Sequence, residues 1–144
     1  MENEIFKALI DLFALINRSD RDKKMIANAG VNLEEAAFRV LVGIAHLQPT
    51  SVGELADKMG KNYSSVSRQI DKLEAAGLVH TYPSSSDSRI RVSELTKRGE
   101  EINGMISLTR ERMMREALAD WTLEEKNDLK NNLKRLFEAM QRFD

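Results

Sequence analysis

The sequence predicts a mainly α-helical chain with one small β-ribbon and long helices at both ends. Apolar residues recur at helical spacing over most of the 144 residues, and this period is typical of amphipathic helices. The period changes only over residues 78–95. At this length, with 42% apolar residues, the chain has enough material for one hydrophobic core. We therefore expect a single domain over residues 1–144.

The first predicted helix is long and carries an apolar stripe on one side. Charged residues crowd positions 18–24 after the stripe, and Gly30 is suited to end a helix. We expect one long helix, bent at most, that reaches about Ala29. The stripe comprises Ile5, Leu9, Leu12, Phe13 and Ile16.

Another helix is expected after Gly30, and its start shows a capping pattern. Asn32 and Glu35 fit a capping box, in which each side chain bonds a backbone N–H of the other residue. Pro49 lies just past the expected end of this helix. Its buried side is predicted to comprise Phe38, Leu41, Val42 and Ala45.

The residues that follow Pro49 predict two shorter helices joined by a tight turn. Ser51 and Glu54 repeat the S-x-x-E capping signature at the start of the first. Gly60 is suited to the turn. The second helix is expected to run from Asn62, a favourable N-cap residue, to about Ala76.

This second helix has two faces of different chemistry when residues are placed at about 100° intervals. One face is an apolar stripe. The other carries hydroxyls and cations, which bond base edges and phosphates in a major groove. An ordinary amphipathic helix with a solvated polar face would show the same pattern, so both interpretations stay open for this helix alone. The stripe comprises Val66, Ile70, Leu73 and Gly77, and the polar face comprises Lys61, Ser64, Ser65, Arg68 and Lys72, with Ser67 at its flank.

A two-stranded ribbon with a polar tip follows, with strands expected at 78–82 and 90–95. Asp87 and Arg89 lie near the tip, two residues apart, so a local salt bridge can fix the direction of the guanidinium. An arginine held in this way can enter a narrow minor groove, where the negative potential is focused. The alternative is a solvated turn pair, although such a pair would stabilise an exposed hairpin very little. Helix, turn, helix and ribbon together are the layout of a winged helix-turn-helix, a fold that binds DNA.

Two more helices are predicted after the ribbon. Thr96 caps a helix from about Lys97 to Ala119, and Thr122 with Glu125 forms a capping box for the last helix. A lone helix pair has too little surface to cover the apolar stripes at both ends of the chain, so we expect them to meet a second copy. Folding of the stripes back onto the same subunit is the alternative. The last stripe comprises Leu129, Leu133, Leu136, Phe137 and Met140.

The order and spacing of the central motifs resemble the MarR family of bacterial transcriptional regulators. The matching pieces run from Leu55 to Gly99 and read L-A-x-x-M-G, S-x-V-S-R-x-I-D-x-L-E-x-x-G-L-V, D-S-R and L-T-K-R-G. The D-x-R of the ribbon and the L-T-x-x-G that opens the next helix are the most distinctive of them. Chain length and terminal helices also fit the layout of the family.

The resemblance implies a homodimer whose N- and C-terminal helices interlock. We expect a DNA-binding lobe over residues 32–99 and dimerisation helices over residues 1–30 and 100–144. Such a dimer would bind a pseudo-palindromic site on double-stranded DNA and regulate a promoter, usually as a repressor. The family also implies a possible small-molecule effector, frequently aromatic or anionic, bound between the dimer helices and the lobe. No residue identifies the operator, the regulated genes, the effector or the direction of regulation.

We assign each candidate residue a role as a hypothesis. Hydroxyls and one arginine of the second helix would read the major groove, and its lysines would bind phosphates. The ribbon would enter the minor groove. The base readers are Ser64, Ser65 and Arg68, with Ser67 less certain; Lys61 and Lys72 contact phosphates; Arg89 enters the minor groove, oriented by Asp87 and supported from the strand by Arg91. Tyr63 and Trp121 are expected to pack against apolar neighbours.

The distribution of charge agrees with a DNA-binding segment. The chain has a net charge of −1, but residues 58–98 contain eight Lys and Arg against four Asp and Glu, a net +4. The remainder therefore carries −5. A basic binding surface on an acidic body is the arrangement that this segregation indicates.

Several other classes of function lack the residues they need. The chain has no cysteine, which excludes disulfides, thiolate zinc sites and cysteine redox sensing. His46 and His80 have no neighbours at metal-ligand spacing, and no nucleophile triad or phosphate-binding glycine motif is present. We therefore expect neither an enzyme nor a cofactor. The acidic start and the absence of a long apolar run predict no membrane contact and a cytoplasmic location. A winged helix that binds protein, and a small-molecule sink that does not act on DNA, remain alternatives.

Overall fold

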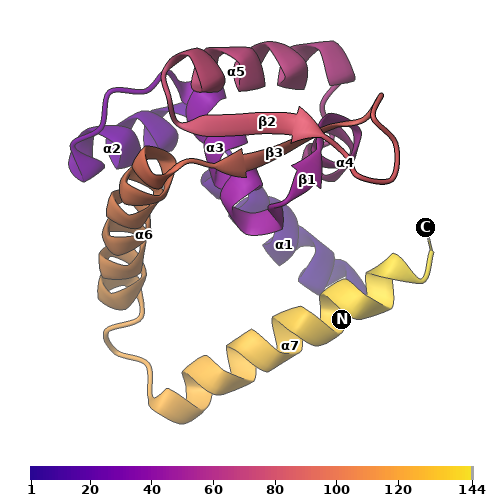
Figure 1. Cartoon of the computed structure of the whole chain (residues 1–144). Coiled ribbons are helices and arrows are strands. Elements are labelled where there is room, and N and C mark those ends of the chain that lie inside the picture. Colours follow the sequence, from indigo (N-terminus) through magenta and orange to yellow (C-terminus); the bar gives the residue numbers. More distant parts are fainter. Residues whose placement is uncertain (144) are drawn as a thin grey trace. The chain divides into compact units, whose positions relative to one another are not determined.

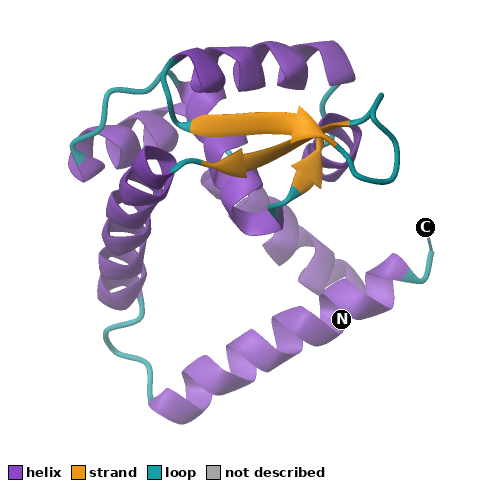
Figure 2. Cartoon of the chain, viewed as in Figure 1, coloured by secondary structure: helices purple, strands orange, loops and turns teal. Residues whose placement is uncertain are grey.

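The computed structural model describes residues 1–143, and these form helices and one three-stranded antiparallel sheet (Figures 1 and 2). The predicted fold class, mainly α with a small β-wing, is confirmed. The strand order in the sheet is β1-β3-β2. The elements are α1 Glu2–Ile16, α2 Ser19–Ala29, α3 Glu35–Leu47, β1 Thr50–Ser51, α4 Val52–Met59, α5 Tyr63–Ala75, β2 Val79–Pro83, β3 Arg91–Leu95, α6 Lys97–Ala117 and α7 Leu123–Gln141.

The chain forms two compact units, one over Met1–Thr109 and another from Arg110 onwards, so that the boundary falls inside α6. The first unit contains the hydrophobic core. Side chains from α3, α4, α5 and α6 meet there with no more than 1% of their surface exposed, and these include Leu41, Ile44, Leu55, Val66, Ile70, Leu73 and Ile106.

The helix-turn-helix is formed by α4 and α5, and its boundaries are set by local chemistry. The Ser51 hydroxyl accepts a hydrogen bond from the Glu54 N–H at 3.1 Å and caps α4. Gly60 ends α4 with a φ of 63°, in the left-handed region that glycine adopts without strain. The side chain of Asn62 then caps α5. The predicted start, turn and end of this motif are therefore confirmed.

The wing, which we define as residues 79–95, is a hairpin of β2 and β3. Val79 pairs with Leu95 and Pro83 pairs with Arg91 across the two strands. The Ser84 N–H donates to the Ile90 carbonyl at 2.8 Å and closes the loop between them. In Figure 1 this loop extends beyond the end of the sheet, as predicted for a polar tip.

The N-terminal segment is two helices, so the prediction of one long helix to Ala29 is wrong. The chain breaks at Asn17 and Arg18, where Arg18 has an extended backbone and the Asn17 amide donates to the Phe13 carbonyl. The guanidinium of Arg39, from α3, donates to the Asn17 carbonyl at 2.9 Å and pairs with Asp22. A long-range contact therefore stabilises the break.

The expected capping box of Asn32 and Glu35 is also wrong. Helix α3 begins at Glu35 with Glu34 as its N-cap residue, and this cap has no side-chain hydrogen bond. The Glu35 carboxylate instead accepts from the Ser19 hydroxyl and pairs with Arg39. It therefore ties α3 to α2 rather than turning back to residue 32.

Gly77 was expected in the buried stripe of α5, but it is exposed and lies outside the helix. Its φ of 74° places it in the left-handed turn that follows α5. The Gly77 N–H donates to the Glu74 carbonyl, and the Leu78 N–H donates to the Leu73 carbonyl, both at 2.9 Å. These bonds satisfy carbonyl groups at the helix end.

The start of α6 packs tightly against the end of the helix-turn-helix. The Thr96 hydroxyl accepts from the Gly99 N–H at 3.1 Å, which confirms the predicted cap. The same hydroxyl donates to the Gly77 carbonyl at 2.6 Å, and the Thr96 N–H donates to the Leu78 carbonyl at 3.0 Å. A Cβ on Gly99 would lie 2.0 Å from that Leu78 carbonyl oxygen. The glycine of the L-T-x-x-G motif therefore permits this close approach.

Helices α1 and α7 have no fully buried side chain among the residues that the structure describes. On α1 the exposed apolar residues include Phe6, Phe13 and Ile16, which are 58%, 67% and 59% exposed. On α7, Phe137 and Met140 are 61% and 57% exposed. The predicted capping box of Thr122 and Glu125 at the start of α7 is confirmed. Trp121, expected to pack, is 42% exposed. Between residues 1 and 143, no helix has the length and apolar character needed to cross a membrane.

Gly99→Ala should lower the free energy of unfolding by roughly 1–3 kcal/mol, because backbone must move to admit the methyl group. Urea denaturation checks this. Gly104→Ala is the matched control on the same helix, since a Cβ there meets nothing within 4 Å. That change should raise stability by up to about 1 kcal/mol through helix propensity. Equal effects of the two substitutions would contradict the tight packing at Gly99.

Candidate nucleic-acid interface

The orientation of α5 is set by its apolar side, which faces the core. Val66, Ile70 and Leu73 are 1%, 0% and 1% exposed. The opposite side therefore faces outward, and Ser64, Arg68 and Lys72 lie exposed on it, as does Lys61 in the preceding turn. Ser65 and Ser67 are half-buried at its edges.

The cations of this surface differ in how far neighbouring carboxylates neutralise them. Within residues 1–143, the side chains of Arg68 and Lys61 form no hydrogen bond or ion pair. The ammonium group of Lys72 lies 3.6 Å from the Glu34 carboxylate, and both side chains are mostly exposed. Such an exposed pair is weak and can exchange partners. Lys61 and Arg68 are therefore available to an external anion, and Lys72 becomes so once Glu34 releases it.

The N-terminus of α5 is capped by the side chain of Asn62. The Asn62 carboxamide oxygen accepts from the Ser65 N–H at 2.7 Å. The remaining free N–H groups and the positive end of the helix dipole lie at this end, next to Lys61. This combination of backbone N–H groups and a lysine suits a phosphate oxygen.

Tyr63, the first residue of α5, lies exposed, so the expectation that it would pack is wrong. Its side chain is 57% exposed. Its angular position near the apolar stripe suggested packing, but at the first position of the helix no neighbouring element covers it. The exposed ring and hydroxyl lie on the same turn as Ser64 and Ser65 and have the chemistry to contact sugars or base edges. Its place in the first turn of the second helix was the sequence signal for this role.

The wing tip carries the predicted salt bridge. Nε and Nη2 of Arg89 each donate to a carboxylate oxygen of Asp87 at 3.1 Å, and the Arg89 backbone N–H donates to Asp87 Oδ1 at 3.0 Å. The Arg89 side chain is 89% exposed. The Arg89 guanidinium, followed by the Arg89 backbone N–H, holds the pKa of Asp87 below its ordinary value. The guanidinium is thus held in one direction while its outer edge stays in solvent.

Arg91 points toward α5 and not toward Arg89. Its Nη2 lies 2.8 Å from Asp71 Oδ1 and 3.4 Å from Glu74 Oε1. The side chain is 27% exposed. The two carboxylates belong to the second helix, which sequence reasoning did not connect to the wing. The signal that could have found them is the spacing of Asp71 and Glu74, three residues apart, which places them on one side of the helix.

A cavity of about 330 Å³ lies between α3 and α5, behind the exposed face of α5. Its polar lining includes Lys61, Gln69 and the ion pair of Arg39 with Glu35. The Gln69 side-chain oxygen is buried and has no hydrogen-bond partner among the described residues. A hydroxyl or an N–H of a small molecule could satisfy this oxygen. Over residues 1–143, no cluster of His, Asp and Glu has the makeup of a metal site.

Comparison with known proteins supplies independent information. Residues 33–91 match the model of the MarR family. The uncharacterized HTH-type transcriptional regulator YxaD of Bacillus subtilis (strain 168) is 29% identical over 108 residues, which cover 75% of this chain and 76% of that protein.

Solved structures share the same architecture. The transcriptional regulator BldR from Sulfolobus solfataricus is 26% identical, with a TM-score of 0.72 over 96% of this chain and 99% of that one. FabT from Streptococcus pneumoniae, in complex with DNA, has a TM-score of 0.71 over 100% of both chains. At 14% identity, FabT shows the fold alone.

Asn62→Ala should lower the free energy of unfolding by about 1 kcal/mol, because it removes the cap of α5. Asn62→Gly should cost only a few tenths of a kcal/mol, since glycine is tolerated at this position. Chemical denaturation of the two variants measures the difference. An Asn62→Ala variant as stable as the wild type would show that the side-chain bond to the Ser65 N–H does not stabilise the helix.

Proposed function

This chain belongs to the MarR family of transcriptional regulators, and we propose that it represses a promoter by binding a pseudo-palindromic operator as a homodimer. The observation that carries the proposal is that two accessible arginines lie on one lobe, one on α5 and one on the wing. Arg68 is exposed on the outward face of α5, and Arg89 is 89% exposed on the wing. The protein would act in the cytoplasm, where a bacterial promoter lies.

In this proposal α5 enters the major groove. Ser64, Ser65 and Arg68 contact base edges, with Ser67 at the flank, because hydroxyls and a guanidinium bond the acceptors that guanine and adenine present there. Lys61 and Lys72 contact phosphates on either side. The burial of the opposite side of α5 supports this arrangement, since it holds these side chains outward.

The wing enters the adjacent minor groove with Arg89 foremost. A narrow minor groove concentrates negative potential and attracts an inserted arginine. The bonds that the Arg89 guanidinium donates to Asp87 support this role. They restrict the guanidinium before DNA arrives, which lowers the entropy lost on binding.

The homodimer is proposed from the exposed apolar side chains of α1 and α7. Each helix has several large apolar side chains that are more than half exposed, and an exposed apolar stripe on a helix in water favours an interface with another helix. Two-fold pairing would bring two copies of α5 about 34 Å apart, one turn of DNA, on half-sites of opposite orientation.

We also propose that a small-molecule effector changes the affinity for DNA. The cavity between α3 and α5 offers the Lys61 ammonium group and an unpaired amide oxygen, which would suit a small aromatic anion that also carries a donor. Arg39 also lines the cavity, but it already pairs with Asp22 and Glu35. A ligand bound against α5 would bias DNA affinity only if it prefers one position of that helix. Library selection with the purified protein would identify the operator, and repetition with benzoate and related anions would test the effector.

Arg68→Ala should weaken operator binding by roughly 1–3 kcal/mol and relax the base preference at one position of each half-site. Lys61→Ala should weaken binding to every duplex and reduce the salt slope by about one unit. Fluorescence anisotropy on operator and scrambled duplexes over a range of salt concentrations separates the two. Equal affinity of the Arg68 variant and the wild type for each duplex would refute the base-reading role.

Phe137→Glu should shift the protein toward monomer and weaken operator binding, because the charge would be buried in the proposed dimer interface. Asn131→Glu is the matched control, since a spacing of about 100° per residue places this exposed residue opposite the centre of the apolar stripe of α7. Analytical ultracentrifugation over a range of concentrations measures both variants. A wild-type protein that stays monomeric while it binds the operator tightly would contradict the dimer.

A further inference from the structure

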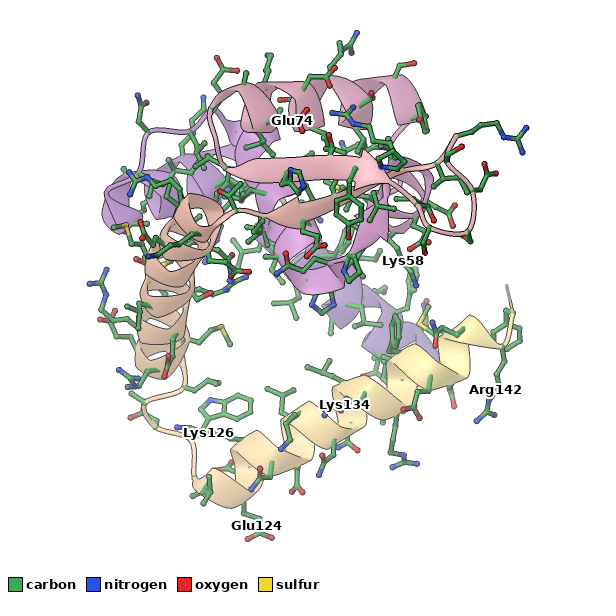
Figure 3. All side chains as sticks on the ribbon, in the orientation of Figure 1. Lys58, Glu74, Glu124, Lys126, Lys134 and Arg142 are labelled. Carbon is green, nitrogen blue, oxygen red and sulfur yellow. The ribbon has the colours of Figure 1, made fainter. Side chains whose placement is uncertain are left out.

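One carboxylate of α5 bonds both strands of the wing. The Glu74 Oε2 atom accepts from the Thr81 N–H at 3.0 Å and from the Thr81 hydroxyl, so β2 is attached. The Glu74 Oε1 atom lies 3.4 Å from Nη2 of Arg91, so β3 is attached as well. Figure 3 labels Glu74 on the side of α5 that faces β2.

A second carboxylate strengthens this junction between α5 and the wing. Asp71, one turn earlier on α5, lies 2.8 Å from the same Nη2 of Arg91. Arg91 pairs with Pro83 across the hairpin and stands two residues after Arg89. The segment that carries the exposed tip is thus anchored to α5 directly at its base.

We propose that Glu74 is a positioning residue that holds the wing at a defined angle to α5, so that Arg89 reaches the minor groove while α5 occupies the major groove. The proposal rests on the function proposed above. It assigns Glu74 no contact with DNA, because both carboxylate oxygens are already bonded to the wing.

Stability alone does not account for this arrangement. Exposed ion pairs contribute about 0–1 kcal/mol to folding, and the Glu74 side chain in this pair is 40% exposed. A carboxylate in a DNA-binding lobe also repels phosphates, so a Glu74 without a positioning role should weaken DNA binding. Removal of Glu74 should therefore weaken DNA binding if Glu74 positions the wing, and should strengthen it if Glu74 only repels phosphates.

The junction persists at neutral pH. The hydroxyl and the N–H of Thr81, with the nearby Arg91, hold the pKa of Glu74 below its ordinary value. The carboxylate therefore stays ionised over the range in which the protein would bind DNA. The groups that face it from the wing are Thr81 and Arg91, and Asp71 lies beside it on α5.

The test is a double-mutant cycle on operator affinity with Glu74→Ala, Arg89→Ala and both together. Glu74→Ala should weaken binding about tenfold, which corresponds to about 1.4 kcal/mol. In the Arg89→Ala background the same change should alter affinity less than twofold, because no tip arginine remains to be positioned. Hydroxyl-radical footprinting should show loss of minor-groove protection while guanine N7 in the major groove stays protected from methylation.

Two further variants separate positioning from charge and folding. Glu34→Ala removes a carboxylate that pairs with Lys72 of α5 and not with the wing, so it should strengthen binding. Thr81→Val removes one bond to Glu74 at nearly constant volume and should weaken binding two- to threefold, again only when Arg89 is present. Thermal unfolding of each variant identifies any loss of folded protein.

The outcomes distinguish the two proposals. Stronger binding by Glu74→Ala, or an equal loss in both backgrounds, overturns the positioning role and leaves the proposed function standing. An Arg89→Ala variant that binds as tightly as the wild type overturns the minor-groove role of the wing, and the positioning role with it.

Discussion

Burial of one side of α5 is the constraint on which the rest of the binding surface depends. Val66, Ile70 and Leu73 are almost completely removed from solvent, and burial of side chains of this size contributes about 1.5–3 kcal/mol each. A rotation of α5 by about half a turn would expose this stripe and bury Arg68. The hydrophobic core therefore determines which side chains of α5 can meet DNA.

Carboxylates decide which cations of this lobe stay accessible, and the net charge of the segment does not show this. All four acidic residues between positions 58 and 98 have specific partners, because Asp71 and Glu74 bond Arg91, Asp87 bonds Arg89, and Glu94 accepts from the Tyr82 hydroxyl. Two arginines of the wing are thus oriented, whereas Lys61 and Arg68 stay available. The net +4 of the segment gives attraction to phosphates, and the pairing decides where each guanidinium points.

Local rules were sufficient for much of the fold. The caps at Ser51, Asn62 and Thr122 are bonds between residues three apart, and the turn at Gly60 depends on one backbone conformation. The Asp87–Arg89 bridge joins residues two apart. Where an interaction closes within one turn of chain, the residue types and their spacing contain nearly all the information, because few alternative partners can compete.

The sequence by itself therefore determined the winged helix-turn-helix, the outward face of α5 and the salt bridge at the wing tip. Only the tertiary structure decided the break before α2, the start of α3 at Glu35, the exposure of Tyr63 and the direction of Arg91. The first two depend on Arg39 and Ser19, which come from other helices, and the last depends on carboxylates 17 and 20 residues away. Partners at such distances are chosen by packing of the whole lobe, which no local pattern encodes.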